Sequence, residues 1–335
     1  MTLSIAKRRS DGILFRLILL WTALLALTSA FNFSYFFFAE GTAGPSKRAL
    51  VGLLTLRSAG FGDILHLLAY CATILAVPML FLAGQVLIER WAAGGPSPRA
   101  SDGLIWPVRW LFHALITGAL TMLTLLDWNP APMHIATLGS GSALEWLTLL
   151  FLYIVWLIAA DIIYYWVHRA EHHFAWMWRL HAVHHAQDDL DVLHNVIHPV
   201  EGFIRYVLIT IPLVTLVKID GAAIFIMVAL MTIQTKLSHM RAPINFGPLG
   251  HLIVDNRYHF IHHSRDPAHY NRNFADRFPF IDRMFGTYLA PGAELPETGL
   301  ADRSPPRTML QYLLAHCPRH DAPEMPVRQL TPQKL

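Results

Sequence analysis

The sequence predicts an all-α, multi-pass membrane helical bundle with a histidine-rich helical cap on its cytoplasmic side. Two observations carry this prediction. Of the 335 residues, 54% are hydrophobic and only 15% are charged, with a mean hydropathy of +0.39, which is too apolar for an ordinary soluble protein. The chain also has 19 histidines, and 14 of them lie between His168 and His269, directly after one of the long apolar runs.

Charge and cysteine content exclude two classes of function. The net charge of +3 and the pI near 8.9 suit a membrane protein with basic loops and give no case for nucleic-acid binding. Cys71 lies in an apolar run and Cys317 in the polar tail, so no disulfide is expected. An iron–sulfur cluster within the chain is excluded, because it would need about four thiolates.

Four apolar runs are long enough to cross a bilayer as helices. They cover about residues 14–38, 64–88, 104–126 and 144–167. The first follows Lys7-Arg8-Arg9 and would also fit a signal peptide. Because it stays apolar and aromatic as far as Phe38, we expect a retained helix.

Two shorter apolar segments, 203–217 and 222–233, predict a helical hairpin that either spans the membrane or is re-entrant. The basic residues near the N-terminus and near Arg90 face the side opposite the uncharged 129–141 loop, which places the histidines in the cytoplasm. Lys47 and its basic neighbours in the first loop argue against this orientation. We expect the plasma membrane, with the endoplasmic reticulum as the alternative.

The histidine spacing predicts metal binding, because residues three or four apart share one face of a helix. The pattern comprises the pair His168 and His172, the triad His181, His184 and His185, and the triad His259, His262 and His263. Imidazole ligates iron, zinc, copper and nickel. Eight imidazoles are too many for one tetrahedral ion, which takes about four ligands. Two metal ions close together are therefore predicted.

These motifs resemble the fatty acid hydroxylase superfamily, the sterol desaturase-like group of membrane di-iron enzymes. The resemblance covers about residues 140–290. It rests on segments that run from Asp161 through His168-Arg-Ala-Glu-His172, His181-Ala-Val-His184-His185, His198-Pro-Val-Glu201, His239 and His259-Phe-Ile-His262-His263 to Phe285-Gly-Thr-Tyr288. It implies three parts: membrane helices over 1–140, a di-iron domain over 141–290 and a Pro-rich polar tail over 291–335.

The resemblance also implies the function. The ligands would be His168, His172, His181, His184, His185, His239, His259, His262 and His263. They would hold two iron ions, with zinc as the alternative metal, in an enzyme that uses O2 to hydroxylate or desaturate a lipid. The electrons would come from an external reductase, because the chain contains no flavin, haem or iron–sulfur motif.

Several residues are expected to support this site or to lie outside it. Asp161 and Asp255 are expected to accept hydrogen bonds from ligating imidazoles. His198 fits either a ligand or a residue beside one. The remaining histidines of the region, His173, His194, His251 and His269, do not follow the spacing and are expected to be structural or on the surface.

Two alternative functions remain. The first is an ether-lipid-cleaving monooxygenase on the same scaffold. The second is a non-oxidative zinc-binding membrane protein, such as a metal transporter. The sequence does not decide the lipid, the carbon attacked or the oligomeric state.

Overall fold

The computed structural model describes residues 143–192, 194–219, 234–241 and 244–319, and a few isolated positions (61–62, 65, 87, 133–135 and 231). Apart from those positions, the expected spans at 14–38, 64–88 and 104–126 lie outside the described residues. The second arm of the hairpin, 222–233, lies outside them in the same way. The structure therefore describes the histidine-rich region and the helices around it.

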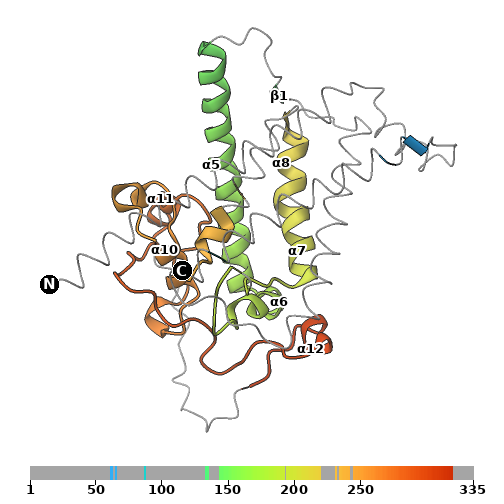
Figure 1. Cartoon of the computed structure of the whole chain (residues 1–335), viewed down its shortest axis with the longest axis vertical. Helices are drawn as coiled ribbons and strands as arrows, with labels where there is room; N and C mark the ends of the chain where they lie inside the picture. The colour runs from blue at the N-terminus through green and yellow to red at the C-terminus, as the bar shows by residue number, and fades with distance from the viewer. Residues whose placement is uncertain are drawn as a thin grey trace.

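The longest element is α5, Ala143–His173, a 31-residue helix that contains neither glycine nor proline. Its segment Leu150–His173 contains an 18-residue stretch with a mean hydropathy of 1.9 and is the one helix in the described part of the chain that is long and apolar enough to cross a bilayer. Large apolar side chains such as Leu150 and Phe151 are exposed along it. The expected fourth span, 144–167, is thus helical and leads directly into the first histidines (Figure 1).

Helix α6, Ala175–His185, begins after a break at Phe174 and packs against α5. A second helix, Pro199–Leu216, runs beside α5 (Figure 1) and consists of α7 (Pro199–Arg205), the π-helical segment η1 (Tyr206–Thr210) and α8 (Ile211–Leu216). It starts sharply because Pro199 occupies the first turn and His198 Nδ1 accepts a hydrogen bond from the Val200 N–H. This helix contains the first arm of the expected hairpin.

The described part of the chain is helical with one small exception. Strand β2, Val217–Ile219, pairs in parallel with β1, Met133–Ile135, so that His134 lies opposite Lys218. The expectation of an all-α fold missed this pair. A strand of three residues is too short to show the alternating hydrophobic pattern by which strands are recognised.

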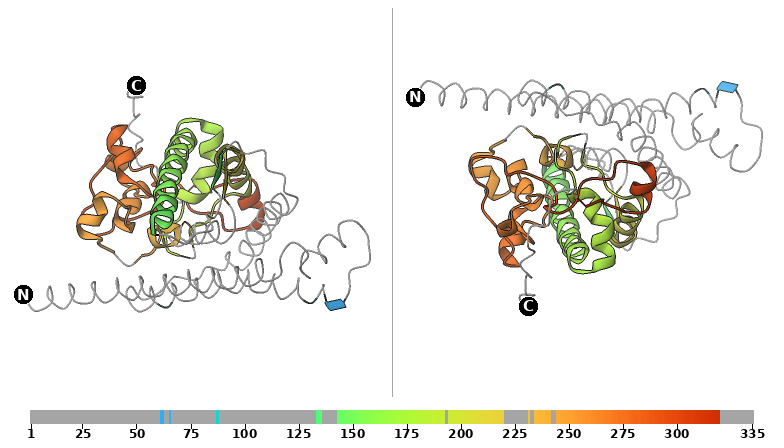
Figure 2. Two further views of the ribbon diagram at one scale, coloured as in Figure 1. Left: turned by 90° about the horizontal axis from the view of Figure 1, so that it is seen from above. Right: turned by 90° about the horizontal axis from the view of Figure 1, so that it is seen from below.

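The remaining elements are short. They are η2 (Gly247–His251), α10 (Asn256–His262), η3 (Pro267–His269), α11 (Pro279–Met284) and α12 (Met309–Leu313). Both views of Figure 2 place the segments from α10 to α11 on one side of α5 and α12 on the other. The second histidine triad therefore comes to the end of α5 from a distant part of the sequence.

The Pro-rich tail is folded at least as far as Arg319. Thr308 and Gln311 form a capping box at the start of α12. Tyr312 is fully buried in a small core with Val183 and Val196, and its hydroxyl donates to the Ile197 carbonyl at 2.7 Å. Cys317 is buried in the same core as a free thiol, and Cys71 lies outside the described residues.

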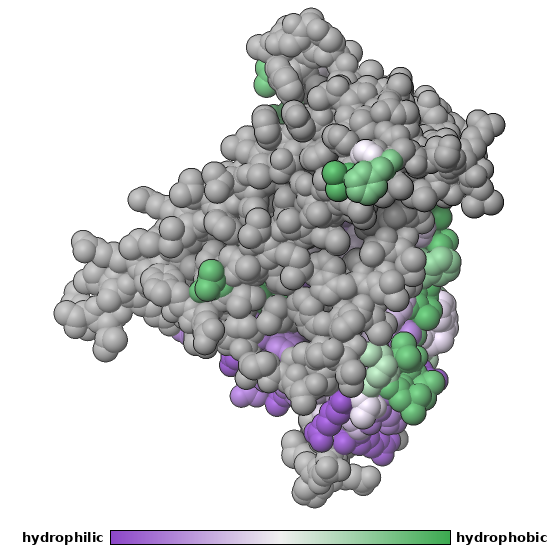
Figure 3. All heavy atoms as spheres, turned by 45° about the vertical axis from the view of Figure 1, so that its right-hand side comes forward, coloured by the Kyte–Doolittle hydropathy of each residue, from purple (hydrophilic) through white to green (hydrophobic). Residues whose placement is uncertain are grey.

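Apolar side chains are exposed on the far side of α5 as well. They include Phe203 and Leu208 in the Pro199–Leu216 helix and Leu310 and Leu314 at α12. Figure 3, which turns this side forward, shows apolar surface along the edge of the described region and polar surface at its lower end.

Candidate metal centre

The structure brings the nine expected histidines into two groups. In the five-histidine cluster, the ligand nitrogens lie within 4.8 Å of one another, and the members are His168, His172, His181, His185 and His262. The four-histidine cluster meets the same limit and consists of His184, His239, His259 and His263. Helices α5, α6 and α10 and the segment around His239 thus converge on one place.

The Nε2 atoms point inward in both clusters. In the five-histidine cluster, the Nε2 of His181 lies 3.1 Å from that of His168 and 3.0 Å from that of His185. In the four-histidine cluster, the Nε2 of His239 lies 3.0 Å from that of His259 and 3.4 Å from that of His184. An ion with metal–nitrogen bonds of about 2.1 Å places adjacent ligand nitrogens about 3.0 to 3.4 Å apart. The observed spacing fits a bound cation.

The outer nitrogens fix the tautomers. The Nδ1 atoms of His168, His184 and His239 lie 2.8, 3.2 and 2.6 Å from main-chain carbonyl oxygens. A carbonyl oxygen only accepts, so in a neutral ring Nδ1 carries the proton and Nε2 keeps a lone pair. The Nε2 atoms of His184 and His239 therefore face each other with two lone pairs and no proton. A cation between them would remove this repulsion.

Burial keeps these imidazoles neutral. It is the largest cause that lowers the pKa of His181, His184, His185 and His259 well below the usual value, and it lowers the pKa of His262 to about 3. Neighbouring imidazoles lower these pKa values further. The Nε2 of His262 is buried without a hydrogen-bond partner. Neutral rings with free lone pairs are the form in which histidine ligates metals.

The two clusters are adjacent. The rings of His185 and His263 are stacked with centroids 4.5 Å apart, and the His184 and His263 centroids lie 4.4 Å apart. The His185–His263 contact joins the two clusters, and the His184–His263 contact lies within the four-histidine cluster. Two ions bound here would be close neighbours, as the histidine count predicted.

The expectation for Asp161 and Asp255 is wrong. The Asp161 carboxylate accepts from the backbone N–H groups of Asp276, Arg277 and Phe278 at 2.9, 3.0 and 2.8 Å. Asp255 caps α10 by accepting from the Tyr258 N–H and pairs with Arg257. Helix periodicity correctly places Asp161 on the same face of α5 as His168. The hydrogen-bond partners of Asp161, however, come from the loop 276–278, which is distant in the sequence.

Glu201 has the role that was expected of the aspartates. Its Oε1 lies 2.9 Å from the Nδ1 of His181, and both side chains are buried. His198 belongs to neither cluster, because its Nδ1 caps α7 and its Nε2 donates to the Leu313 carbonyl at 3.2 Å. In the sequence, Glu201 stood out only as part of the His198-Pro-Val-Glu201 segment of the family resemblance.

The four histidines that do not follow the spacing lie outside both clusters. His173 and His251 are exposed and His269 is half-buried. His194 is buried and pairs with the Asp191 carboxylate at 2.7 Å. These positions agree with the expected surface or structural roles.

A further carboxylate that the sequence did not reveal orders the loop beside His168. Asp282 is fully buried and accepts from the N–H groups of Phe274 and Ala275, both at 2.8 Å. It also accepts from the Thr287 hydroxyl at 2.7 Å and from the Tyr258 hydroxyl. Because the Phe274 carbonyl faces His168 Nδ1, Asp282 supports the five-histidine cluster from outside.

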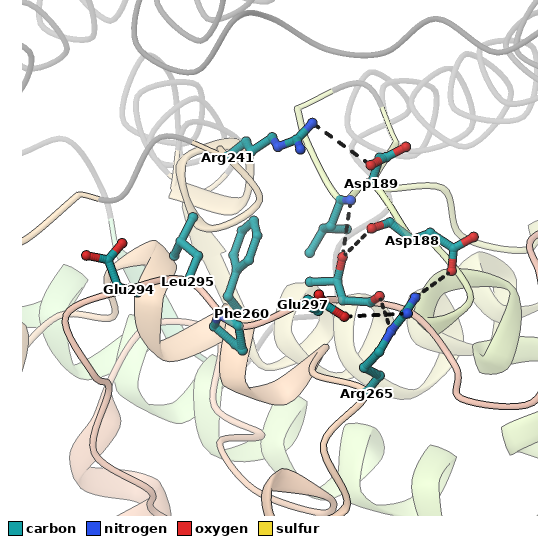
Figure 4. A pocket seen from close by; sticks show the side chains of 11 residues that line it. Asp188, Asp189, Arg241, Phe260, Arg265, Glu294, Leu295 and Glu297 are labelled. Atoms are coloured by element: carbon teal, nitrogen blue, oxygen red, sulfur yellow. Dashed lines mark hydrogen bonds and ion pairs between the residues drawn. The ribbon is translucent and has the colours of Figure 1, made fainter. Parts of the chain in front are cut away.

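A pocket of about 590 Å³ lies on the other side of α10, where Phe260 reaches its wall (Figure 4). Its charged groups pair with one another, with Arg265 3.2 Å from Asp188 and Arg241 3.9 Å from Asp189. None of the nine clustered histidines lines it. This pocket is separate from the candidate metal centre.

Comparison with known proteins agrees with the geometry. Residues 153–287 match the family model described as fatty acid hydroxylase, and this segment holds all nine clustered histidines. The segment that holds the histidine clusters is therefore similar to a fatty acid hydroxylase domain. The wider resemblance to the fatty acid hydroxylase superfamily is thereby confirmed.

Three relatives illustrate the range of this superfamily. An alkylglycerol monooxygenase from Xenopus tropicalis is 26% identical over 256 residues, which are 73% of this chain and 53% of the relative. The ornithine lipid hydroxylase OlsE from Rhizobium tropici is 26% identical over 191 residues, 53% of this chain and 56% of the relative. The very-long-chain aldehyde decarbonylase GL1-4 from Oryza sativa subsp. indica is 27% identical over 151 residues, 42% of this chain and 24% of the relative.

This chain thus spans between a quarter and just over half of the length of these relatives. No solved structure matches it.

Proposed function

We propose that the chain is a membrane-bound, non-haem di-iron oxidoreductase that uses O2 to oxidise a lipid. The observation that carries the proposal is the pair of adjacent histidine clusters, in which buried lone pairs face one another inside a segment similar to a fatty acid hydroxylase domain. The nine clustered histidines would be the ligands, with five on one ion and four on the other. Zinc would fit the same imidazoles, so the choice of iron rests on the resemblance to the fatty acid hydroxylase superfamily.

The proposed cofactor supplies the oxidative chemistry: two bound ferrous ions would provide electrons to activate O2 for attack on an unactivated C–H bond. The side chains provide the setting. The histidines hold the ions, the carbonyl and carboxylate partners orient the rings, and burial excludes water from the centre.

Hydroxylation consumes one O2, two electrons and two protons for each lipid, and it yields the hydroxylated lipid and one water. Two electrons must therefore come from outside the chain, because no flavin, haem or iron–sulfur motif is visible in the sequence. A separate reductase or small electron carrier is the proposed partner. Desaturation would consume the same equivalents and yield a double bond and two waters.

A lipid substrate fits the position of the centre. Helix α5 contains the candidate span Leu150–His173 and carries His168 and His172 in its last turns. A substrate that enters from the bilayer would reach the clusters where this helix leaves the membrane. The names of the relatives, which include an ornithine lipid hydroxylase and an alkylglycerol monooxygenase, support a lipid as well.

Ether-lipid cleavage is the second candidate function. The match to an alkylglycerol monooxygenase covers 73% of this chain. In such a reaction, hydroxylation of the carbon beside the ether oxygen gives a hemiacetal that breaks down to an aldehyde and an alcohol. The same centre would serve both reactions, and substrate placement would decide between them.

The proposed topology is a multi-pass bundle with the histidine clusters on the cytoplasmic side. The basic-residue pattern supports the cytoplasmic orientation, and the plasma membrane is the proposed location, with the endoplasmic reticulum as the alternative. Exposed apolar side chains along α5 and along the Pro199–Leu216 helix support contact with lipid.

The test is a comparison of lipids from cells that express the parent chain or the His184→Ala variant, grown under 18O-labelled O2. The proposal expects a lipid that gains one labelled oxygen, or loses two hydrogens, only with the parent chain. A fatty aldehyde that appears together with loss of an ether lipid would select the second candidate. Lipids that are identical in both cultures, together with zinc in the protein purified without added metal, would contradict the oxidase proposal.

A further inference from the structure

One imidazole of the five-histidine cluster is held differently from its neighbours. The Nδ1 of His181 lies 2.9 Å from the Glu201 carboxylate, whereas the Nδ1 atoms of His168 and His262 lie 2.8 and 2.9 Å from main-chain carbonyl oxygens. His181 is also central, because its Nε2 lies within 3.1 Å of the Nε2 atoms of both His168 and His185. A change at His181 would therefore reach the whole cluster.

Glu201 belongs to a buried charge cluster. Arg205 donates to Glu171 from Nε at 2.8 Å and from Nη2 at 2.6 Å, and its Nη2 also lies 3.0 Å from Glu201 Oε1. The Arg205 Nη1 donates to the Tyr164 hydroxyl at 3.1 Å. Glu171 and Glu201 are each only 1% exposed. The guanidinium thus holds two buried carboxylates in fixed positions.

Three helices meet in this charge cluster. Helix α5 supplies Tyr164 and Glu171, α6 supplies His181, and α7 supplies Glu201 and Arg205 one turn apart. Arg205 is the last residue before the π-helical segment η1. The ligand atoms of Glu171, His181 and Glu201 lie within 4.8 Å of one another, as they would around a metal ion. The Arg205 guanidinium contacts all three side chains, so it occupies the position that a further cation would take.

We propose that Glu201, held by Arg205 and Glu171, is a positioning residue that fixes the tautomer and ring orientation of His181 and thereby sets the metal affinity of the five-histidine cluster. A carboxylate that accepts from the outer nitrogen of a ligating imidazole makes that ring a stronger donor. The Nδ1 atoms of His168, His184, His239 and His262 lie against main-chain carbonyl oxygens instead. The charge cluster should therefore act on one metal ion and leave the other unchanged.

The inference rests on the proposed metal binding and does not depend on the oxidation of a lipid. A purely structural role, in which the charge cluster only holds α5, α6 and α7 together, makes a different prediction. It would weaken both clusters alike and lower the stability of the metal-free chain. The test must therefore measure each cluster separately.

The test is an anaerobic titration of the full chain in detergent micelles with Co²⁺, followed by its absorption spectrum. The His259→Ala background disrupts the four-histidine cluster and leaves the other intact. The His168→Ala background does the reverse. In the first background, Glu201→Gln should weaken Co²⁺ binding about 10- to 100-fold. In the second background, it should change the affinity less than threefold.

Two further variants complete the design. Arg205→Lys keeps the positive charge but loses the bidentate contact with Glu171. It should weaken Co²⁺ binding to the five-histidine cluster by a smaller factor than Glu201→Gln does. It also provides the test if Glu201→Gln does not fold. Arg303→Lys is the matched control, because it makes the same substitution at a residue that pairs with Asp302 at 3.4 Å, outside both clusters. It should leave both affinities unchanged.

The outcomes separate the two proposals. Equal weakening in both backgrounds, or unchanged binding in both, would overturn the positioning role of Glu201 while leaving the proposed function in place. A parent chain that binds no Co²⁺ and no Fe²⁺ would overturn both. Weakening that is confined to the His259→Ala background would support the inference whether or not the lipid product has been found.

Discussion

Asp161 is the residue whose replacement tests the architecture most sharply. It is fully buried within α5, and its two oxygens accept three backbone N–H groups from residues 276–278. This contact holds the loop that begins near Phe274, whose carbonyl faces His168 Nδ1. Loss of the carboxylate should therefore reduce both the stability of the fold and the affinity for metal.

The hydrogen bonds set the size of the effect. A buried N–H left without a partner costs about 1–3 kcal/mol. Asp161→Ala removes the acceptor for all three groups, but the Phe278 N–H is only partly buried and water can satisfy it. The two fully buried N–H groups give an expected loss of about 2–6 kcal/mol, out of a typical free energy of unfolding of about 5–15 kcal/mol. Asp161→Asn keeps one acceptor oxygen and should cost about 1–3 kcal/mol.

Denaturant titration of the metal-free chain in detergent micelles measures these losses, and Co²⁺ titration measures the affinity. Asp189→Asn is the control, because Asp189 is 41% exposed and lies 3.9 Å from Arg241. It should change the stability by less than about 0.5 kcal/mol. The reasoning is refuted if Asp161→Asn is as stable as the parent chain, or if Asp161→Ala is no less stable than Asp161→Asn.

Three further predictions follow from the same contacts. His184→Ala should reduce bound metal from two ions per chain to one by mass spectrometry, while His194→Ala, whose buried ring pairs with Asp191, should keep both; equal metal content in the two variants would contradict the assignment of ligands. The metal-free chain should lose stability as the pH falls below about 6.5, by about 1.4 kcal/mol per pH unit for each buried imidazole such as His262. The reason is that the pKa of the imidazole is lowered in the folded chain, so the unfolded chain binds more protons. Thermal melting between pH 8 and 5 measures this loss, and a flat profile would count against it. Tyr312→Phe should cost about 0.5–1.5 kcal/mol through loss of the bond to the Ile197 carbonyl, and unchanged unfolding in denaturant would show that α12 does not support the fold.

Helical periodicity was sufficient to find eight of the nine histidines in the two clusters, and the family resemblance added His239. His181, His184 and His185 recur at intervals of three and four, and such intervals place side chains on one face whatever lies opposite. The number of imidazoles then suggested two ions, and the structure does contain two clusters. The long apolar run before His168 likewise predicted α5, because an uninterrupted apolar segment needs no distant partner to become helical.

The supporting carboxylates could not be found in this way. Asp161, Glu201 and Asp282 contact groups that are 115, 20 and 8 residues away, respectively, in the chain. Which carboxylate meets an imidazole, and which meets a loop, depends on how the helices pack. Sequence intervals favoured Asp161 because it lies two turns from His168, but the 276–278 loop occupies its oxygens. The partner of His181 came from a third helix.

The most direct test of the central claim is the metal content and coordination of the purified chain after anaerobic loading with Fe²⁺. We predict two iron ions per chain and an X-ray absorption spectrum dominated by imidazole nitrogens at about 2.1 Å. One ion or none per chain, or a first shell made mainly of oxygen ligands, would contradict the claim that the nine histidines form a di-metal centre.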